Sequence, residues 1–225
     1  MNLLLKASSS QRPSSIKLTG RKAESNRLLL LQALYPNLVL DNTSNSDDSE
    51  VMLKALQNSQ LLTPNSQLID VHHAGTAMRF LTAYYSIQNG RKVTLTGSDR
   101  MKQRPIKVLV DALNKLGAEI SYQENEGFPP LTIVGKKLTK DAITIPSNIS
   151  SQYITALCLI GTKLENGLTI NLDGKIISVP YIQMTIQLLN KVGIEAIFEG
   201  NTIKIPFTEN IKAQNLQVES DWSSA

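Results

Sequence analysis

A seven-residue motif occurs at two places in this chain of 225 residues. Leu113–Glu119 has the sequence Leu-Asn-Lys-Leu-Gly-Ala-Glu, and Leu189–Glu195 has Leu-Asn-Lys-Val-Gly-Ile-Glu. Before each copy, apolar residues recur at the spacing of an amphipathic helix, and the glycine suits the left-handed backbone that ends such a helix. Repeated units bury their apolar faces against one another, so the motif constrains the chain to a repetitive fold.

The parallel extends upstream of the motif. Phe80–Ala83 matches Tyr153–Ala156, and an Asn-Gly turn follows each stretch and leads into a predicted strand. A third, more diverged copy spans residues 25–56. The sequence therefore predicts an α/β (α+β) domain in which helix, strand, loop, helix and strand occur three times. The predicted helices are 27–34, 49–56, 80–87, 108–116, 153–160 and 182–192, and the predicted strands are 38–42, 93–97, 118–122, 169–174 and 194–198.

The two ends of the chain depart from this pattern. Residues 202–206 and 215–218 are predicted strands, and Asp221 followed by Ser223 and Ser224 is typical of a helix N-cap. We therefore expect a domain over residues 16–218. Residues 219–225 would lead back to a second domain, to which the N-terminal strand or loop 1–15 would also belong.

Three polar clusters each stand directly before an apolar helical stretch: Gly20–Arg27, His73–Arg79 and Ser150–Gln152. The start of a helix presents unpaired N–H groups and the positive end of the helix dipole, so it favours phosphate and carboxylate groups. If the three repeats are related by pseudo-symmetry, these helix starts converge. The sequence thus predicts one pocket for a substrate with several negative charges.

Cations accompany these clusters. Lys22 and Arg27 are placed to bracket an anion, and Arg79 in the first turn of a helix opposes the helix dipole, which indicates a ligand or a carboxylate partner. Arg100, Lys102 and Arg104 crowd one loop without an acidic residue between them. The alternatives are a solvated loop at Lys22 and Arg27, an ordinary loop-to-helix junction at 75–79 and an exposed charge run at 100–104. Capping alone accounts for one of the serines at 150 and 151.

Composition excludes several classes of protein. The sequence holds no apolar run of the roughly 18–20 residues that cross a membrane, and its single cysteine, Cys158, lies in an apolar stretch, so we expect a buried thiol and a cytoplasmic protein. The net charge of +4 would suit nucleic acid, but aromatic residues are only 5% and long basic runs are lacking. His72 and His73 lack metal-ligand spacing, and Asp47 and Asp48 suit a helix cap better than catalysis.

Taken together, the clusters resemble the enolpyruvyl transferase family, and within it the members that act on shikimate 3-phosphate. Five ordered motifs carry the resemblance: Gly20–Arg27, Ala74–Arg79, Arg100–Ile106, Ser150–Gln152 and Ser178–Tyr181. The resemblance implies an enolpyruvyl-transferase-like domain with helices packed inside and small sheets outside. It also implies transfer of the enolpyruvyl group from phosphoenolpyruvate to the 5-hydroxyl of shikimate 3-phosphate, without metal or organic cofactor.

By the same resemblance, two sets of residues hold the substrates, and Lys22 has the catalytic role. The residues for phosphoenolpyruvate are Lys22, Gly75, Arg104 and Gln152. The residues for shikimate 3-phosphate are Lys22, Ala23, Arg27, Ser150, Ser151, Gln152, Ser178 and Tyr181. The chain departs from the family pattern at Arg21, Ala23, His73 and Val179, and Ala23 lacks the hydroxyl expected on the substrate phosphate.

Family members are about twice as long as this chain, and their acid and base carboxylates lie in the other half. We therefore expect a substrate-binding half that binds without turnover, completed by the missing domain in a monomeric full-length protein. Two alternatives remain. One is the related transferase that acts on UDP-N-acetylglucosamine, in which a cysteine on a glycine-rich loop is the general acid. The other is a non-catalytic anion- or RNA-binding module, for which RNA binding would depend steeply on salt.

Overall fold

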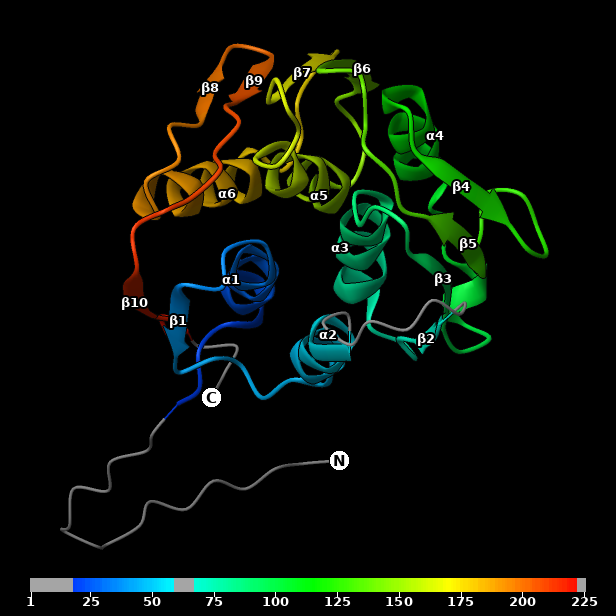
Figure 1. The fold of residues 1–225 in the computed structure, drawn as a ribbon, viewed down its shortest axis with the longest axis horizontal. Helices are drawn as coiled ribbons and strands as arrows, with labels where there is room; N and C mark the ends of the chain where they lie inside the picture. The colour runs from blue at the N-terminus through cyan, green and yellow to red at the C-terminus, as the bar shows by residue number, and fades with distance from the viewer. Residues whose placement is uncertain (1–17, 59–66, 222–225) are drawn as a thin grey trace, which may run out of the picture.

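The structure is a computed structural model that describes residues 18–58 and 67–221. Its elements form three units, and each unit contributes one inner helix to the centre of the molecule (Figure 1). The first unit contains α1 (Lys22–Leu34), β1 (Leu38–Asp41) and α2 (Asp47–Asn58). The second contains β2 (Gln67–Asp70), α3 (Gly75–Ser86), β3 (Lys92–Thr96), the short 3-10 helix η1 (Met101–Gln103), α4 (Lys107–Leu116), β4 (Glu119–Tyr122) and β5 (Leu131–Val134). The third contains β6 (Ala142–Pro146), α5 (Ser151–Gly161), β7 (Leu168–Asp173), α6 (Val179–Lys191), β8 (Ile197–Glu199) and β9 (Thr202–Ile205), and β10 (Gln214–Gln217) follows it.

The second and third units have the same sheet topology. Their strand orders are β2-β3-β5-β4 and β6-β7-β9-β8, with a parallel first pair and antiparallel pairs after it. A parallel pair needs a crossover connection, and α3 and α5 supply it. In the first unit β10 pairs in parallel with β1, so the end of the described chain completes the sheet of its beginning. The predicted three-unit α/β fold, with helices inside and small sheets outside, is confirmed.

The helices α1, α3 and α5 pack against one another in the middle of the molecule. Every residue of α3 is buried, and all of α5 is buried except Gln152. A helix that is enclosed on all sides must be apolar around its whole circumference, and Phe80, Leu81 and Leu157 meet this need with no exposed surface. The predicted burial of Cys158 is confirmed, and burial raises the pKa of its thiol to about 12.

The repeated motif makes the same contacts in both copies. Asn114 bonds both backbone groups of Ile120, accepting from its N–H and donating to its C=O, each at 3.0 Å. Asn190 does the same with Ala196, at 2.8 and 3.2 Å. The asparagine therefore fixes the turn from each outer helix to the strand that follows. This shared geometry explains why Leu-Asn-Lys-x-Gly recurs in the sequence.

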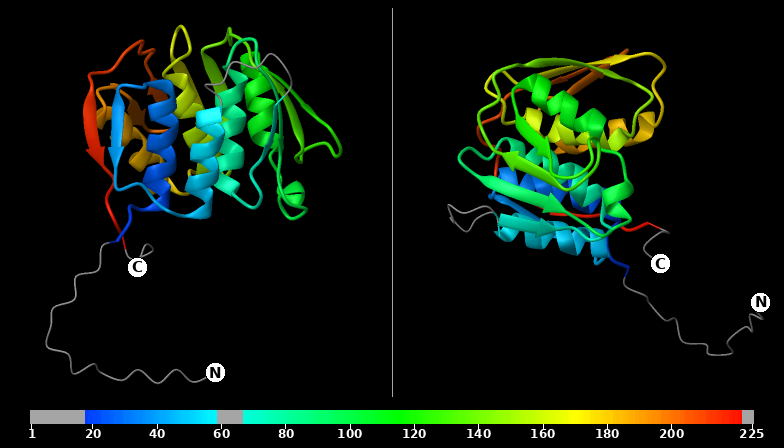
Figure 2. Two further views of the ribbon diagram at one scale, coloured as in Figure 1. Left: turned by 60° about the horizontal axis from the view of Figure 1, so that its bottom comes forward. Right: turned by 90° about the vertical axis from the view of Figure 1, so that its right-hand side faces the viewer.

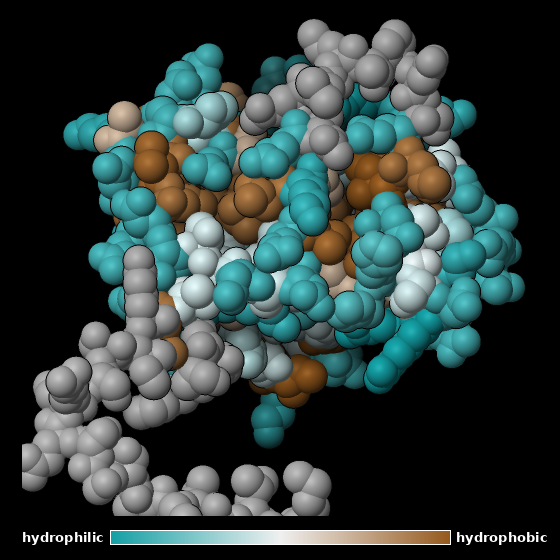
Figure 3. Space-filling model, turned by 90° about the horizontal axis from the view of Figure 1, so that it is seen from below, coloured by the Kyte–Doolittle hydropathy of each residue, from teal (hydrophilic) through white to brown (hydrophobic). Residues whose placement is uncertain are grey.

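The first unit differs from the other two. Its sheet has two strands, and the part of it that the structure describes contains no counterpart of the β4–β5 hairpin. A groove along α1 and α2 remains on this side, lined by residues that include Leu29, Leu53 and Leu56. The face on which α2 lies shows hydrophobic side chains among polar ones (Figure 3).

Several predicted boundaries were wrong. The three inner helices begin earlier than expected, at Lys22, Gly75 and Ser151, because polar residues form their first turns ahead of the apolar stretch. The strand expected at 194–198 begins only at Ile197, since Ile194–Ala196 belongs to the turn held by Asn190. The strands β2, β5 and β6 were not predicted at all. Residues 1–17 and 222–225 lie outside the described residues, so the domain boundaries stay a prediction.

The two ends of the described chain lie side by side (Figure 2). The Arg21 N–H donates to the carbonyl of Glu219 at 2.8 Å, and the Gly20 N–H donates to the carbonyl of Asn42 at 2.9 Å. The start of α1 is therefore fixed by both the sheet and the end of the chain. None of the described helices is long and apolar enough to cross a membrane.

We expect Gly117→Ala and Gly193→Ala each to lower the free energy of unfolding by about 1 kcal/mol, because both glycines have a left-handed backbone that an L side chain resists. Their φ angles are 110° and 90°. Urea denaturation measures the change. Gly193→Asn is the matched variant, and it should recover part of the loss because asparagine tolerates this conformation. Equal stability of Gly193→Ala and the parent chain would contradict the equivalence of the two turns.

Candidate functional site

The N-terminal ends of the three inner helices meet at a hollow of about 350 Å³. Gln152 in the first turn of α5 donates from Nε2 to Thr76 Oγ1 in α3 at 3.2 Å, which links two of these helix starts directly. The predicted convergence of helix starts is therefore present in the structure. The hollow is lined by Lys22, Ser46, Asp47, Asp48, His73, Gly75, Thr76, Arg104 and Gln152.

The cations of this hollow are uncompensated. Lys22 and Arg104 are exposed, and no carboxylate of the described residues lies within ion-pair distance of either. The two carboxylates in the lining are engaged elsewhere. Asp47 pairs with His73 at 3.4 Å, and Asp48 accepts from the backbone N–H of Ala77 at 3.0 Å. The hollow therefore presents free positive charge to a ligand.

Asp48 has a structural task that explains its position. The N-cap of α3, Ala74, offers no side chain to the unpaired N–H groups of the first turn, and the Asp48 carboxylate supplies the missing acceptor from α2. It also accepts from Asn26 Nδ2 of α1 at 3.4 Å. Asp47 and Asp48 form the first turn of α2, two residues ahead of the predicted helix start, and Asp48 additionally joins the first three helices around the hollow.

Gly75 lies against two guanidinium groups. A Cβ atom at this position would lie 2.7 Å from Arg79 Nη1 and still closer to Arg104 Nη1. Only glycine leaves room for both arginines at the start of α3. The residues expected to hold phosphoenolpyruvate, which are Lys22, Gly75, Arg104 and Gln152, all line this one hollow.

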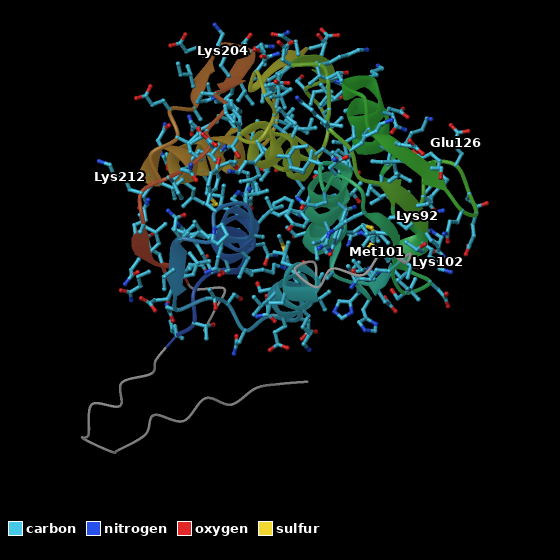
Figure 4. The ribbon with its side chains drawn as sticks, viewed as in Figure 1. Lys92, Met101, Lys102, Glu126, Lys204 and Lys212 are labelled. Carbon is cyan, nitrogen blue, oxygen red and sulfur yellow. The ribbon has the colours of Figure 1, made fainter. Side chains whose placement is uncertain are left out.

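The basic loop before α4 divides its cations. Arg104 lines the hollow, and Arg100 lines an adjoining depression with His73. Lys102 pairs instead with Glu124 at 3.0 Å, and Figure 4 shows it at the edge of the molecule. The crowding predicted for the three cations is therefore relieved for Lys102 by an acidic residue between β4 and β5, far along the sequence.

Arg27 does not line the hollow. Its side chain is 3% exposed, and its guanidinium donates to Thr185 Oγ1 at 2.9 Å, to the Ala23 carbonyl at 2.7 Å and to Thr155 Oγ1 at 3.2 Å. A longer bond of 3.4 Å reaches the Tyr181 carbonyl. Desolvation lowers the pKa of Arg27 to about 10. Because α1 begins at Lys22, Arg27 falls in its second turn and lies between α1, α5 and α6.

Of the other residues expected at shikimate 3-phosphate, Lys22 and Gln152 line the hollow, whereas Ala23, Ser150, Ser151, Ser178 and Tyr181 do not. Ser150 is the N-cap of α5 and accepts from the Gln152 N–H at 3.3 Å, as capping predicts, while Ser151 is buried. Ser178 precedes α6 with a left-handed φ of 61°, and Tyr181 is 50% exposed. Ser150, Ser151 and Gln152 stand at the start of α5, and Ser178 stands at the start of α6.

The departures near Lys22 have structural counterparts. Arg21 pairs with Glu24 at 2.8 Å and with Glu219 at 3.3 Å, so its charge joins the two ends of the described chain. Ala23 offers only backbone atoms, and its carbonyl is bonded to Arg27. Ser46 and Thr76 also line the hollow, although no motif indicated a role for them. For Ser46 the signal was its place just before an acidic helix start.

A larger hollow of about 600 Å³ lies near the C-terminal ends of α1, α3 and α5. Its lysines are already engaged. Lys136 pairs with Glu119 at 3.3 Å, Lys137 pairs with Glu165 at 2.6 Å, and Lys163 lies 3.8 Å from the centre of the Tyr35 ring. Because two of these lysines are paired with carboxylates and Lys163 lies over a tyrosine ring, size alone does not make it a better anion site than the hollow at the helix starts.

The chain is similar to proteins of one family. The sequence profile of EPSP synthase (3-phosphoshikimate 1-carboxyvinyltransferase) matches residues 8–225. A 3-phosphoshikimate 1-carboxyvinyltransferase of Bacteroides fragilis strain YCH46 is 47% identical over 226 residues, which cover 100% of this chain and 53% of the relative. One of Paraburkholderia phytofirmans is 37% identical, over 96% of this chain and 55% of the relative.

The fold has a counterpart among solved structures. EPSP synthase from Acinetobacter baumannii superposes with a TM-score of 0.76 at 21% identity, over 92% of this chain and 50% of that protein. The chain thus spans about half the length of the curated relatives it matches. With a profile match over nearly its whole length, the chain belongs to the EPSP synthase family.

Proposed function

We propose that this chain carries the substrate-binding residues for transfer of the enolpyruvyl group from phosphoenolpyruvate to the 5-hydroxyl of shikimate 3-phosphate. The observation that carries the proposal is the meeting of two uncompensated cations, Lys22 and Arg104, with Gly75 and Gln152 at one hollow. Both substrates are polyanions, and two free cations at converging helix starts favour such ligands. The names of the relatives support the same reaction.

The proposed roles follow the chemistry of the groups. Arg104 offers a planar fork to a carboxylate or phosphate, whereas Lys22 offers a point charge that can follow the reacting oxygen. In the reaction the 5-hydroxyl adds to C2 of phosphoenolpyruvate as its methylene carbon takes up a proton. Phosphate then leaves as the methyl carbon loses a proton. Lys22 and Arg104 would stabilise the negative charge on the phosphate as it leaves.

Shikimate 3-phosphate would lie beside this position, towards the starts of α5 and α6. Ser150, Ser151, Gln152, Ser178 and Tyr181 offer hydroxyl and amide groups there, with Ala23 contributing backbone atoms. Arg27 would join this set by exchanging its internal acceptors for the substrate. The remaining part of the protein would cover the hollow, in a monomeric cytoplasmic enzyme without cofactor.

We expect calorimetric titration of the chain with shikimate 3-phosphate, followed by phosphoenolpyruvate, to show saturable binding. Lys22→Met should weaken that binding at least about tenfold, because one of two free cations is lost. Lys204→Met is the matched control, since Lys204 is an exposed cation on β9 that does not line the hollow and lies at the outer edge of the molecule (Figure 4). Equal loss in both variants, or binding of RNA with a steep salt dependence in place of both substrates, would contradict the proposal.

A further inference from the structure

Arg79 is a buried cation without a counterion. Its side chain is 6% exposed, and no carboxylate of the described residues lies within ion-pair distance. Its Nε atom is buried and has no hydrogen-bond partner. A buried charge that is neither paired nor fully hydrogen-bonded costs stability. A residue that destabilises the fold in this way is expected to have a functional role.

The contacts of Arg79 lead to the hollow. Its Nη1 atom donates to the Gly75 carbonyl at 2.7 Å, at the first residue of α3. Its guanidinium lies 5.9 Å from the centre of the Tyr153 ring, and the Tyr153 hydroxyl donates to the Pro105 carbonyl at 2.6 Å. Arg79 therefore contacts both Gly75 and Tyr153, and Tyr153 in turn holds the backbone next to Arg104.

The electrostatics agree with this geometry. Burial, the largest cause, lowers the pKa of Arg79. Tyr153 opposes that shift, and the nearby charge of Arg104 adds to it. The guanidiniums of Arg79 and Arg104 flank Gly75. An anion bound in the hollow would therefore offset the repulsion between these two positive charges. Positive charge close to a low-dielectric site acts on a ligand more strongly than the same charge in water.

We propose that Arg79 is a positioning residue of the anion site: it holds the Gly75 carbonyl and Tyr153 in place and adds positive charge beneath the hollow. It does not itself touch the ligand. This inference rests on the proposed function of the hollow, because the anion it serves is the carboxylate or phosphate of phosphoenolpyruvate.

The position of Arg79 distinguishes this role from simple packing. A residue kept for packing would lower stability when it is replaced. The Nε atom of Arg79 is buried without a hydrogen-bond partner, and no carboxylate of the described residues pairs with its charge, so a methionine of similar length should leave the fold at least as stable. The proposal therefore predicts that anion affinity and stability respond in different directions.

The experiment measures inorganic phosphate and phosphoenolpyruvate binding by calorimetry, and urea denaturation in parallel, for Arg79→Met, Arg79→Lys and the charge-matched control Lys204→Met. We expect Arg79→Met to bind both anions about tenfold more weakly without a lower denaturation midpoint. Arg79→Lys should recover most of the affinity, and Lys204→Met should match the parent chain.

Three results would overturn the inference. Unchanged affinity of Arg79→Met, while the parent chain binds phosphoenolpyruvate, would refute it and leave the proposed function intact. Affinity and stability falling together, with Arg79→Lys no better than Arg79→Met, would assign the residue to packing. A parent chain that binds neither anion would remove the proposed function, and this inference with it.

Discussion

Mixed with phosphoenolpyruvate and shikimate 3-phosphate, this chain alone should release no measurable phosphate. We then add the part of a curated relative that has no counterpart in this chain. This addition should raise the rate by at least about 100-fold, which is the lower range of what a positioned acid or base contributes. The reason lies in the lining of the hollow. Asp48 holds the first turn of α3, and Asp47 is exposed to solvent beside His73, so the hollow holds no shielded carboxylate positioned as an acid or base.

Phosphate release is measured with the Bacteroides fragilis relative as the source of the remaining part, because that protein is 47% identical to this chain. Arg104→Met in this chain should suppress the restored activity. Lys212→Met should not, because Lys212 is an exposed cation at the outer edge of the molecule (Figure 4) and does not line the hollow. Turnover by the chain alone would contradict the assignment of both aspartates. An inactive mixture in which the two parts demonstrably associate would count against the proposed function.

Most of the fold and the location of the hollow could be predicted from two features of the sequence, the repeated motif and the polar clusters at the helix starts. The recurring Asn in Leu-Asn-Lys-x-Gly makes the same pair of backbone bonds in both copies, so a sequence repeat here reflects a repeated local structure. The convergence of the helix starts then followed from pseudo-symmetry. Local patterns were sufficient because each unit forms its own helix and turn before packing against the others.

The missed strands depended on partners remote in sequence. Residues 67–70 and 131–134 become β2 and β5 by pairing with the two edges of β3. β6 does alternate, with Ile143 and Ile145 buried, and this pattern could have been recognised. The contacts of Lys102 with Glu124 and of Arg27 with Thr185 join residues far apart along the chain, and no local pattern indicates them.

The motif and the structure indicate different roles for Arg27. The motif assigns it to shikimate 3-phosphate, but the structure surrounds it with oxygen acceptors from α1, α5 and α6. Both roles are compatible only if the guanidinium can exchange its internal acceptors for the substrate. A substitution at this position therefore tests stability and binding together.

We expect Arg27→Ala to lower the free energy of unfolding by about 2–3 kcal/mol, because it opens a cavity between three helices and removes the donor to two threonines. Removing a buried charge is favourable and offsets part of that loss. Arg27→Met refills the cavity, so it should lose about half as much stability as Arg27→Ala. Urea denaturation measures both variants, and Thr185→Val completes a double-mutant cycle in which the pair should couple. If Arg27→Ala leaves stability unchanged but abolishes shikimate 3-phosphate binding, the internal hydrogen bonds contribute little to stability. The role of Arg27 is then substrate binding alone, as the motif implies. Arg79 has a buried Nε without a partner, and its replacement by methionine should not lower stability, because the number of satisfied donors decides whether a buried guanidinium supports the fold or weakens it.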